Sequence, residues 1–106
     1  MYIYNKENLK AKEIVQGFFG KFIHSENITT AFWEVTAGSY LPEHEHIHEQ
    51  ITQVTEGEFE MIIDNNKYLL KPGDVAVIPA NVKHSGKAVT NCKLSDTFYP
   101  HRKDYN

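Results

Sequence analysis

Residues 38–57 read GSYLPEHEHIHEQITQVTEG and bring several potential metal-binding side chains close together in the chain. His44 and His46 are separated by one residue, and Gln50 follows four positions after His46. In an extended strand, side chains two positions apart point to the same face, so the two imidazoles are expected to project together. Two imidazoles alone make a weak metal site, because a stable site needs further donors from elsewhere in the fold.

A second segment, residues 73–84, reads GDVAVIPANVKH and supplies a further imidazole. A pair of histidines on a strand is commonly an ordinary surface feature, but the distant third histidine and a nearby amide favour a site for one divalent ion. The predicted metal ligands are His44, His46, Gln50 and His84. Neutral imidazoles bind nickel, zinc, iron and manganese alike, so the sequence leaves the metal open among these.

The spacing of both segments resembles the cupin superfamily of small β-barrels with a metal centre. The first cupin motif contains a glycine, a His-x-His pair, a glutamate and a second glycine, and the second contains a glycine, a proline, another glycine and a histidine. This chain departs at Gln50, where the glutamate is expected, and at Asn81, where a glycine is expected. Asparagine tolerates the left-handed backbone conformation, so the second departure should cost little. The resemblance implies an all-β fold, a single cupin barrel of the double-stranded β-helix or jelly-roll type.

The rest of the chain consists of short apolar or alternating segments separated by turn signals, which is typical of an all-β barrel or sandwich. Expected strands cover residues 18–24, 28–35, 50–55, 58–63, 67–70, 75–78 and 92–99. The pair Asn65-Asn66 suits a tight hairpin, because asparagine accepts a positive φ. Residues 6–15 are expected to form no more than a turn of helix.

Length and composition indicate one cupin domain over residues 1–106, with metal motifs at 38–57 and 73–84 and an active-site tail at 94–105. The formal net charge is -3 with both signs mixed, so no basic stripe indicates nucleic acid. Cys92 is the only cysteine, which favours a reducing compartment. No apolar run approaches the roughly 18 residues of a membrane span, and no signal peptide is evident. We therefore expect a cytoplasmic protein without nucleic-acid or membrane partners.

The amide of Gln50 changes the charge of the predicted metal site. Three imidazoles and an amide carry no negative charge, whereas a glutamate would cancel part of the charge of a divalent ion. The ion should therefore be more electrophilic, favour an anionic ligand such as the carboxylate of a small acidic sugar, and act as a Lewis acid. The same neutrality should weaken metal affinity, because hard cations lose a carboxylate donor.

The C-terminal segment carries an acid on an apolar strand face. If residues 92–99 form a strand, Leu94, Asp96 and Phe98 share one face. A carboxylate there is costly to bury unless it is paired or used in chemistry. Arg102 is a natural partner for Asp96, or a donor pair for a substrate carboxylate. Two interpretations stay open: a structural ion pair between Asp96 and Arg102, or a catalytic role for both.

A closer resemblance covers roughly the last two thirds of the chain. The runs HEHIHEQIT, GEFE and DTFYPHRKDY, which begin at residues 44, 57 and 96, are similar to the pectin-degradation cupin family. Members of that family convert 4,5-unsaturated monouronates into the open-chain 5-keto-4-deoxyuronate. The resemblance implies that the metal and Arg102 bind the uronate, that Asp96 transfers the proton, and that Phe98 packs against the sugar.

Other interpretations of the same residues remain. A cupin dioxygenase would use the same ligands with a redox metal, and a non-catalytic sugar-binding cupin would bind uronates without turnover. His48 is expected at the pocket wall or the surface, with a role as an alternative ligand left open. The apolar segments at residues 2–4 and 17–19 look like edge strands that could pair across a two-fold axis, so we expect a homodimer. Alternatively, they complete the sheets of the barrel itself.

Overall fold

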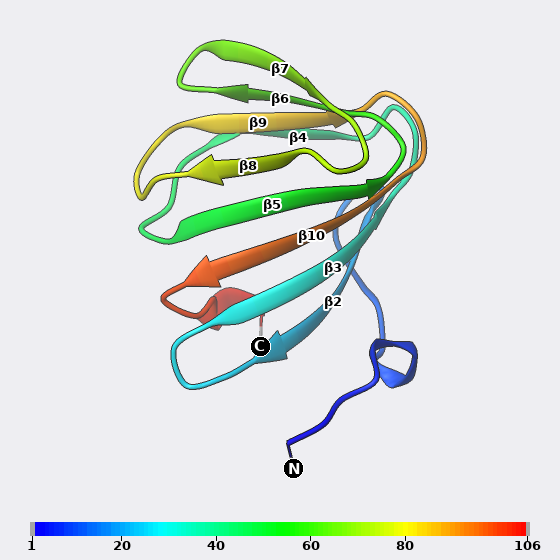
Figure 1. The fold of residues 1–106 in the computed structure, drawn as a ribbon, viewed down its shortest axis with the longest axis vertical. Coiled ribbons are helices and arrows are strands. Elements are labelled where there is room, and N and C mark those ends of the chain that lie inside the picture. Colours follow the sequence, from blue (N-terminus) through cyan, green and yellow to red (C-terminus); the bar gives the residue numbers. More distant parts are fainter. Residues whose placement is uncertain (1, 106) are drawn as a thin grey trace.

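The computed structural model describes residues 2–105, which form two layers of β-sheet (Figure 1). The strands are β1 (Lys12–Val15), β2 (Phe18–His24), β3 (Thr29–Val35), β4 (Tyr40–His44), β5 (Glu49–Glu56), β6 (Phe59–Ile63), β7 (Asn66–Leu70), β8 (Val75–Ile78), β9 (His84–Ala88) and β10 (Cys92–Tyr99). Short 3-10 helices, η1 (Lys6–Asn8) and η2 (Lys103–Tyr105), lie near the two ends. Within the described residues, no helix has the length and apolar character needed to span a membrane.

The strands form two antiparallel sheets packed as a jelly-roll barrel, which confirms the predicted all-β architecture. The larger sheet has the order β1-β2-β3-β10-β5-β8, and the smaller has the order β4-β9-β6-β7. Strands far apart in the sequence are neighbours, since β10 pairs with both β3 and β5. This pairing places the C-terminal strand inside the larger sheet, next to the strand that carries Gln50.

The core lies between the two sheets and follows from side-chain alternation along the strands. On β10, Leu94, Asp96 and Phe98 are buried, as their shared parity predicts, while their neighbours in sequence are more exposed. Phe18 of the larger sheet meets Phe59 of the smaller sheet edge to face, with ring centroids 6.3 Å apart. Such a T-shaped contact is favourable between aromatic rings. Asp96 is therefore a carboxyl group on the buried face of a strand, between two apolar residues of that face.

Non-glycine residues with positive φ mark two of the expected turns. Asp64 and Asn65 have φ angles of 49° and 66°, so the β6–β7 hairpin is centred on Asp64-Asn65. The prediction of a turn at Asn65-Asn66 was wrong by one position, because Asn66 already pairs with Ile63 as the first residue of β7. Asn81 has a φ of 62°, which confirms the left-handed conformation expected where the cupin motif has a glycine.

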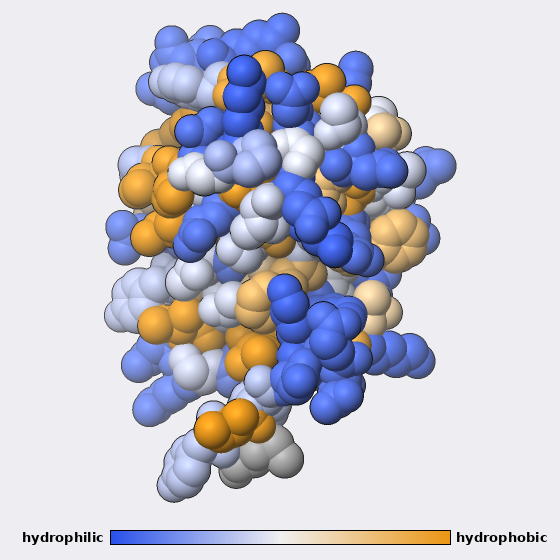
Figure 2. Space-filling model, turned by 45° about the vertical axis from the view of Figure 1, so that its right-hand side comes forward, coloured by the Kyte–Doolittle hydropathy of each residue, from blue (hydrophilic) through white to orange (hydrophobic). Residues whose placement is uncertain are grey.

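The N-terminal segment differs from the prediction. Residues 2–4 form no strand. The edges of the larger sheet are β1 and β8, and residues 18–19 belong to β2 inside it, so for this segment the alternative, that it completes a sheet of the barrel, is confirmed. Tyr2 and Ile3 are 100% and 83% exposed. Figure 2 shows this end of the chain protruding below the body, with hydrophobic (orange) surface uncovered. Helical structure in residues 6–15 is limited to η1, because Lys12–Val15 pairs with β2.

Candidate metal centre

Three histidines converge from separate segments of the chain. His44 ends β4 and His84 begins β9, and the pairing of these strands places the two residues opposite each other. His46 lies in the loop between β4 and β5. One ring nitrogen from each histidine lies within 4.8 Å of the others, and the ring centroids of His44 and His84 are 4.2 Å apart. This group, called here the histidine group, is able to bind a metal ion.

His44 and His46 meet as predicted, but strand alternation is not the reason. Strand β4 ends at His44, and its pairing with β9 is irregular between Leu41 and His44. His46 therefore projects from a loop, and the path of that loop brings its ring to 5.7 Å from the ring of His44, measured between centroids. The prediction that both imidazoles project from one strand was wrong.

Each imidazole of the histidine group has one nitrogen beside a backbone carbonyl. The Nδ1 atoms of His44, His46 and His84 lie 2.8, 2.9 and 2.8 Å from the carbonyl oxygens of residues 42, 48 and 82. A carbonyl oxygen only accepts, so each Nδ1 carries the ring proton and each Nε2 keeps its lone pair. These contacts orient the rings and leave the Nε2 atoms available for a metal.

His84 provides the clearest test of whether the group fits a metal. Its side chain is fully buried, and its Nε2 atom has no hydrogen-bond partner within residues 2–105. Burial lowers the pKa of His84 to about 4, so the ring is neutral near pH 7. A buried nitrogen without a partner costs free energy unless something binds it. A metal ion within the histidine group would supply that bond.

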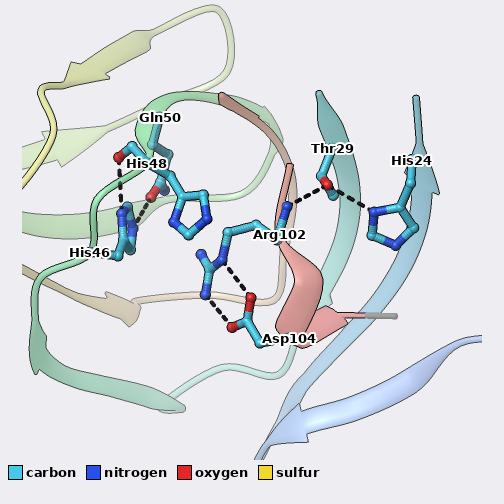
Figure 3. A network of polar contacts seen from close by, with 7 residues as sticks. All are labelled: His24, Thr29, His46, His48, Gln50, Arg102 and Asp104. Atoms are coloured by element: carbon cyan, nitrogen blue, oxygen red, sulfur yellow. Dashed lines mark hydrogen bonds and ion pairs between the residues drawn. The ribbon is translucent and has the colours of Figure 1, made fainter. Parts of the chain in front are cut away.

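Gln50 directs its carbonyl oxygen toward the histidine group (Figure 3). Its Oε1 lies 3.0 Å from Nε2 of His46, while its Nε2 donates to Thr52 Oγ1 at 2.9 Å and to Asp96 Oδ1 at 3.2 Å. Those two bonds fix which end of the amide faces His46. The lone pairs of His46 Nε2 and Gln50 Oε1 then face each other across 3.0 Å. Two adjacent ligand atoms, each about 2.1 Å from a bound ion, have a similar separation. The four predicted ligands therefore fit a divalent ion.

His48 lies beside the histidine group and is not a member of it. Its backbone carbonyl accepts the Nδ1 proton of His46, and the two ring centroids are 5.3 Å apart. Its own Nδ1 is buried and has no partner within the described part of the chain. The contribution of His48 to the group is thus made through its backbone.

Asp96 is a buried carboxyl surrounded by hydrogen-bond donors. It accepts from Thr52 Oγ1 at 2.6 Å and from Gln50 Nε2 at 3.2 Å, both on Oδ1, and from Trp33 Nε1 at 2.9 Å on Oδ2. Burial raises the pKa of Asp96, although the three hydrogen bonds favour the ionised form. Asp96 can therefore hold a proton at a higher pH than an ordinary aspartate, as a general acid–base requires.

Of the two interpretations left open for Asp96 and Arg102, the structural ion pair is not formed within residues 2–105. Arg102 pairs instead with Asp104, with Nε donating to Oδ1 at 3.0 Å and Nη2 donating to Oδ2 at 2.7 Å (Figure 3). The guanidinium also lies over the rings of Phe98 and Tyr105, 4.7 and 4.2 Å from their centroids. The local turn explains the choice, because Asp104 is only two residues away and can take both donors on one edge of the guanidinium.

Most of the predicted site residues line a cavity of about 60 Å³, but His46 does not. Its wall is mainly apolar and aromatic with a few converging polar groups, which is typical of small-molecule sites. The predicted site residues that line it are His44, Gln50, His84, Asp96, Phe98 and Arg102. The cavity therefore brings the metal-binding group and the C-terminal tail into one site.

The residues of this cavity that were not named as site residues from the sequence include Trp33, Thr52 and Tyr105. A sequence signal for Thr52 existed, since it shares the strand parity of Gln50. Its position opposite Asp96 across β5 and β10 became visible only in the structure. Tyr105 packs against Phe22 with centroids 4.7 Å apart, which holds the end of the tail over the cavity. Trp33 carried no comparable signal, because its bond to Asp96 depends on the packing of side chains.

Comparison with known proteins agrees with this arrangement. The sequence model of the Cupin_2 family, described as Cupin domain, matches residues 31–98. Pectin degradation protein KdgF of Dickeya dadantii (strain 3937) is 39% identical over 64 residues, which span 58% of this chain and 58% of that protein. An RmlC-like cupin from Shewanella frigidimarina has a TM-score of 0.95 at 26% identity, covering 100% of this chain and 96% of its own. KdgF from Halomonas sp. has a TM-score of 0.94 at 25% identity, covering 100% and 99%.

The matched segment covers more than half of the chain and contains all four predicted metal ligands. The jelly-roll barrel and the position of the histidine group within it agree with the two motifs that the sequence analysis identified. The chain belongs to the Cupin_2 family of cupin domains.

Proposed function

We propose that this chain is a metal-dependent enzyme of pectin degradation that opens the ring of 4,5-unsaturated uronate monosaccharides. The proposed product is the open-chain 5-keto-4-deoxyuronate. One observation carries the proposal: a single cavity is lined by residues of the histidine group, a buried carboxyl group with a raised pKa, and an arginine. The relatives named KdgF, one of which is called a pectin degradation protein, support the substrate class.

The proposed conversion is an isomerisation and needs no co-reactant. The bond between the anomeric carbon and the ring oxygen breaks, and the anomeric hydroxyl loses its proton to become an aldehyde. The released ring oxygen on carbon 5 becomes a carbonyl as carbon 4 gains a proton. Catalysis therefore requires stabilisation of negative charge on oxygen and a residue that accepts and returns one proton.

The residues that would hold the ion are His44, His46, Gln50 and His84, with nickel, zinc, iron and manganese as the candidate metals. When bound there, the ion would supply Lewis-acid polarisation of a sugar oxygen. These four ligands carry no negative charge when the imidazoles are neutral, so the site remains favourable for an anionic sugar.

The residues of the tail would handle the proton and the substrate. Asp96 accepts the proton of the anomeric hydroxyl and returns it to carbon 4, so its protonation state is restored after each turnover. Arg102 binds the carboxylate of the sugar, and Phe98 provides an apolar surface against the ring. Burial of Asp96 supports this role, because it raises the pKa of the carboxyl group above the ordinary value for an aspartate.

The test follows the ultraviolet absorbance of the conjugated double bond in a 4,5-unsaturated uronate. Protein stripped with a chelator is compared with protein reloaded with each candidate metal, and we expect loss of absorbance only in a reloaded sample. Saturable binding of uronates without turnover would indicate a sugar-binding cupin instead. Dioxygen uptake with a diol or enol substrate would indicate a dioxygenase, and either result would contradict the proposal.

We further propose that the chain acts as one cupin domain and as a homodimer. The two sheets contain strands from Lys12 to Tyr99, so a single barrel includes the whole histidine group and the tail strand. The exposed apolar side chains near the N-terminus support a contact between two copies. Sedimentation equilibrium of the protein and of a variant with serine at Tyr2 and Ile3 would test the dimer.

A further inference from the structure

The guanidinium of Arg102 is held on one edge by a carboxylate that belongs to the same turn. Asp104 accepts from Nε at 3.0 Å and from Nη2 at 2.7 Å, which is the bidentate geometry of the side edge. A guanidinium has five N–H donors in a rigid plane. Asp104 does not use the end edge formed by Nη1 and Nη2, which is equally suited to a second carboxylate.

The faces and the backbone of Arg102 are fixed as well. Phe98 and Tyr105 lie under the guanidinium at 4.7 and 4.2 Å from its central carbon to their ring centroids. The backbone N–H of Arg102 donates to Oγ1 of the fully buried Thr29 at 2.8 Å (Figure 3). The side chain of Arg102 is only 10% exposed and lines the cavity. The orientation of its end edge is therefore determined by its neighbours.

We propose that Asp104 is a positioning residue, which fixes the guanidinium of Arg102 so that its Nη1–Nη2 edge binds the carboxylate of the sugar. Asp104 itself is 57% exposed and does not line the cavity, so it acts through Arg102. Without Asp104, the side edge formed by Nε and Nη2 would be open to the substrate carboxylate, which could bind there and not at the Nη1–Nη2 edge. The guanidinium would also be free to rotate away from the cavity. The identity of the carboxylate as that of a uronate depends on the function proposed above.

Asp104→Asn provides the test, because the amide has nearly the same shape but offers one acceptor in place of two. We expect KM for the unsaturated uronate to rise about tenfold, the loss of roughly one charge-assisted hydrogen bond, with little change in kcat. The methyl ester of the same uronate should show less than about a twofold change, because it has no carboxylate to orient. Asp104→Glu should recover part of the lost affinity. Lys103→Gln, a charge change of the same size and opposite sign in the same turn, should leave KM for both substrates unaffected.

Three kinetic results would overturn the proposal. If KM for the acid is unchanged, Asp104 does not position the guanidinium for the substrate. If KM falls, Asp104 competes with the substrate carboxylate for the guanidinium. If acid and ester are affected equally, together with a lower melting temperature, the role of Asp104 is only to stabilise the tail.

A crystal structure of Asp104→Asn separates this inference from the proposed function. A guanidinium displaced from its position over Phe98 and Tyr105 would support positioning by Asp104, even if no uronate is turned over by the wild-type protein. An unchanged guanidinium would overturn the inference, even if the wild-type protein is active on uronates.

Discussion

Gln50 donates from its Nε2 atom to Oδ1 of Asp96 across 3.2 Å, while the carbonyl end of the same amide faces the histidine group. One side chain therefore connects the proposed metal site to the proposed proton carrier. A change at the metal site should therefore affect Asp96, and a change at Asp96 should affect the metal site. The reason is that the amide cannot rotate without exchanging its donor and acceptor ends.

Thr52→Val should weaken metal binding although Thr52 is not a ligand. The hydroxyl accepts from Gln50 at 2.9 Å and donates to Asp96 at 2.6 Å, so its loss removes a contact that orients the amide. We expect metal affinity to fall about tenfold, as is common for residues that orient a ligand. Metal titration by calorimetry measures the effect. Thr97→Val, the same substitution on the outer face of β10, is the control, and an equal loss there would contradict the prediction.

Gln50→Glu should retain the metal more tightly and bind acidic substrates more weakly. The carboxylate adds a negatively charged donor, which strengthens metal binding and reduces the attraction of an anionic sugar. The variant also brings a second carboxyl close to Asp96, so one of the two must take up a proton. Chelator competition and the KM for the uronate report the two effects. Tighter binding of the uronate by this variant would count against the neutral-site argument.

His84→Ala should abolish stoichiometric metal binding. The substitution removes Nε2 of His84, which is buried without a hydrogen-bond partner among residues 2–105, and two imidazoles with an amide are a poor site. Elemental analysis of the purified proteins should show about one equivalent of metal in the wild type and little in the variant. His24→Ala removes a histidine outside the group and serves as the control. Full metal content in His84→Ala would exclude His84 as a ligand.

The metal-free protein should lose stability in mild acid because of His84. Its pKa is about 4 in the folded protein against the usual 6.5, so the unfolded chain binds more protons between these values. The free energy of unfolding should fall as the pH is lowered through this window, by on the order of 3 kcal/mol, and should level off below it. Urea unfolding of the protein after removal of metal with a chelator, at a series of pH values, measures how the free energy of unfolding changes with pH. His84→Ala should show a shallower slope, and parallel curves would contradict the prediction.

Asp96→Asn should lower kcat without releasing the metal. An amide can occupy the same volume and keep some of the hydrogen bonds of Asp96, but it cannot carry the proton. A loss of about a hundredfold or more is expected for removal of a general acid–base. The absorbance assay and elemental analysis are read together. Ser95→Ala, on the opposite face of the same strand, is the control, and unchanged kinetics in Asp96→Asn would remove Asp96 from the mechanism.

The parts of the fold that depend on local patterns could be predicted from the sequence. Strands β2, β8 and β10 have the bounds expected from their apolar runs. Four potential ligands were found because their motifs combine glycine and proline turns with histidines at fixed spacing. The proximity of the three imidazoles depends on the pairing of β4 with β9 and on the loop that carries His46, and strand alternation alone predicts neither.

The polar network around Asp96 could not be derived in the same way. Its donors Thr52 and Trp33 are 44 and 63 residues away in the sequence, and their contacts depend on the register and packing of three strands. For Arg102 the burial argument favoured Asp96 as the partner, whereas the short turn to Asp104 decides the pairing. Competition between near and distant acids depends on side-chain geometry, which the pattern of residues does not specify.

The backbone contacts of the three Nδ1 atoms determine how an ion would be loaded and released. Each ring is held by a carbonyl two residues away, so the chelate is assembled beforehand and ligation requires little ordering of the chain. Each ring also has only one basic nitrogen left, for which a proton and a cation compete. Acid should therefore displace the ion, because protons compete with it for the Nε2 atoms of the histidine group.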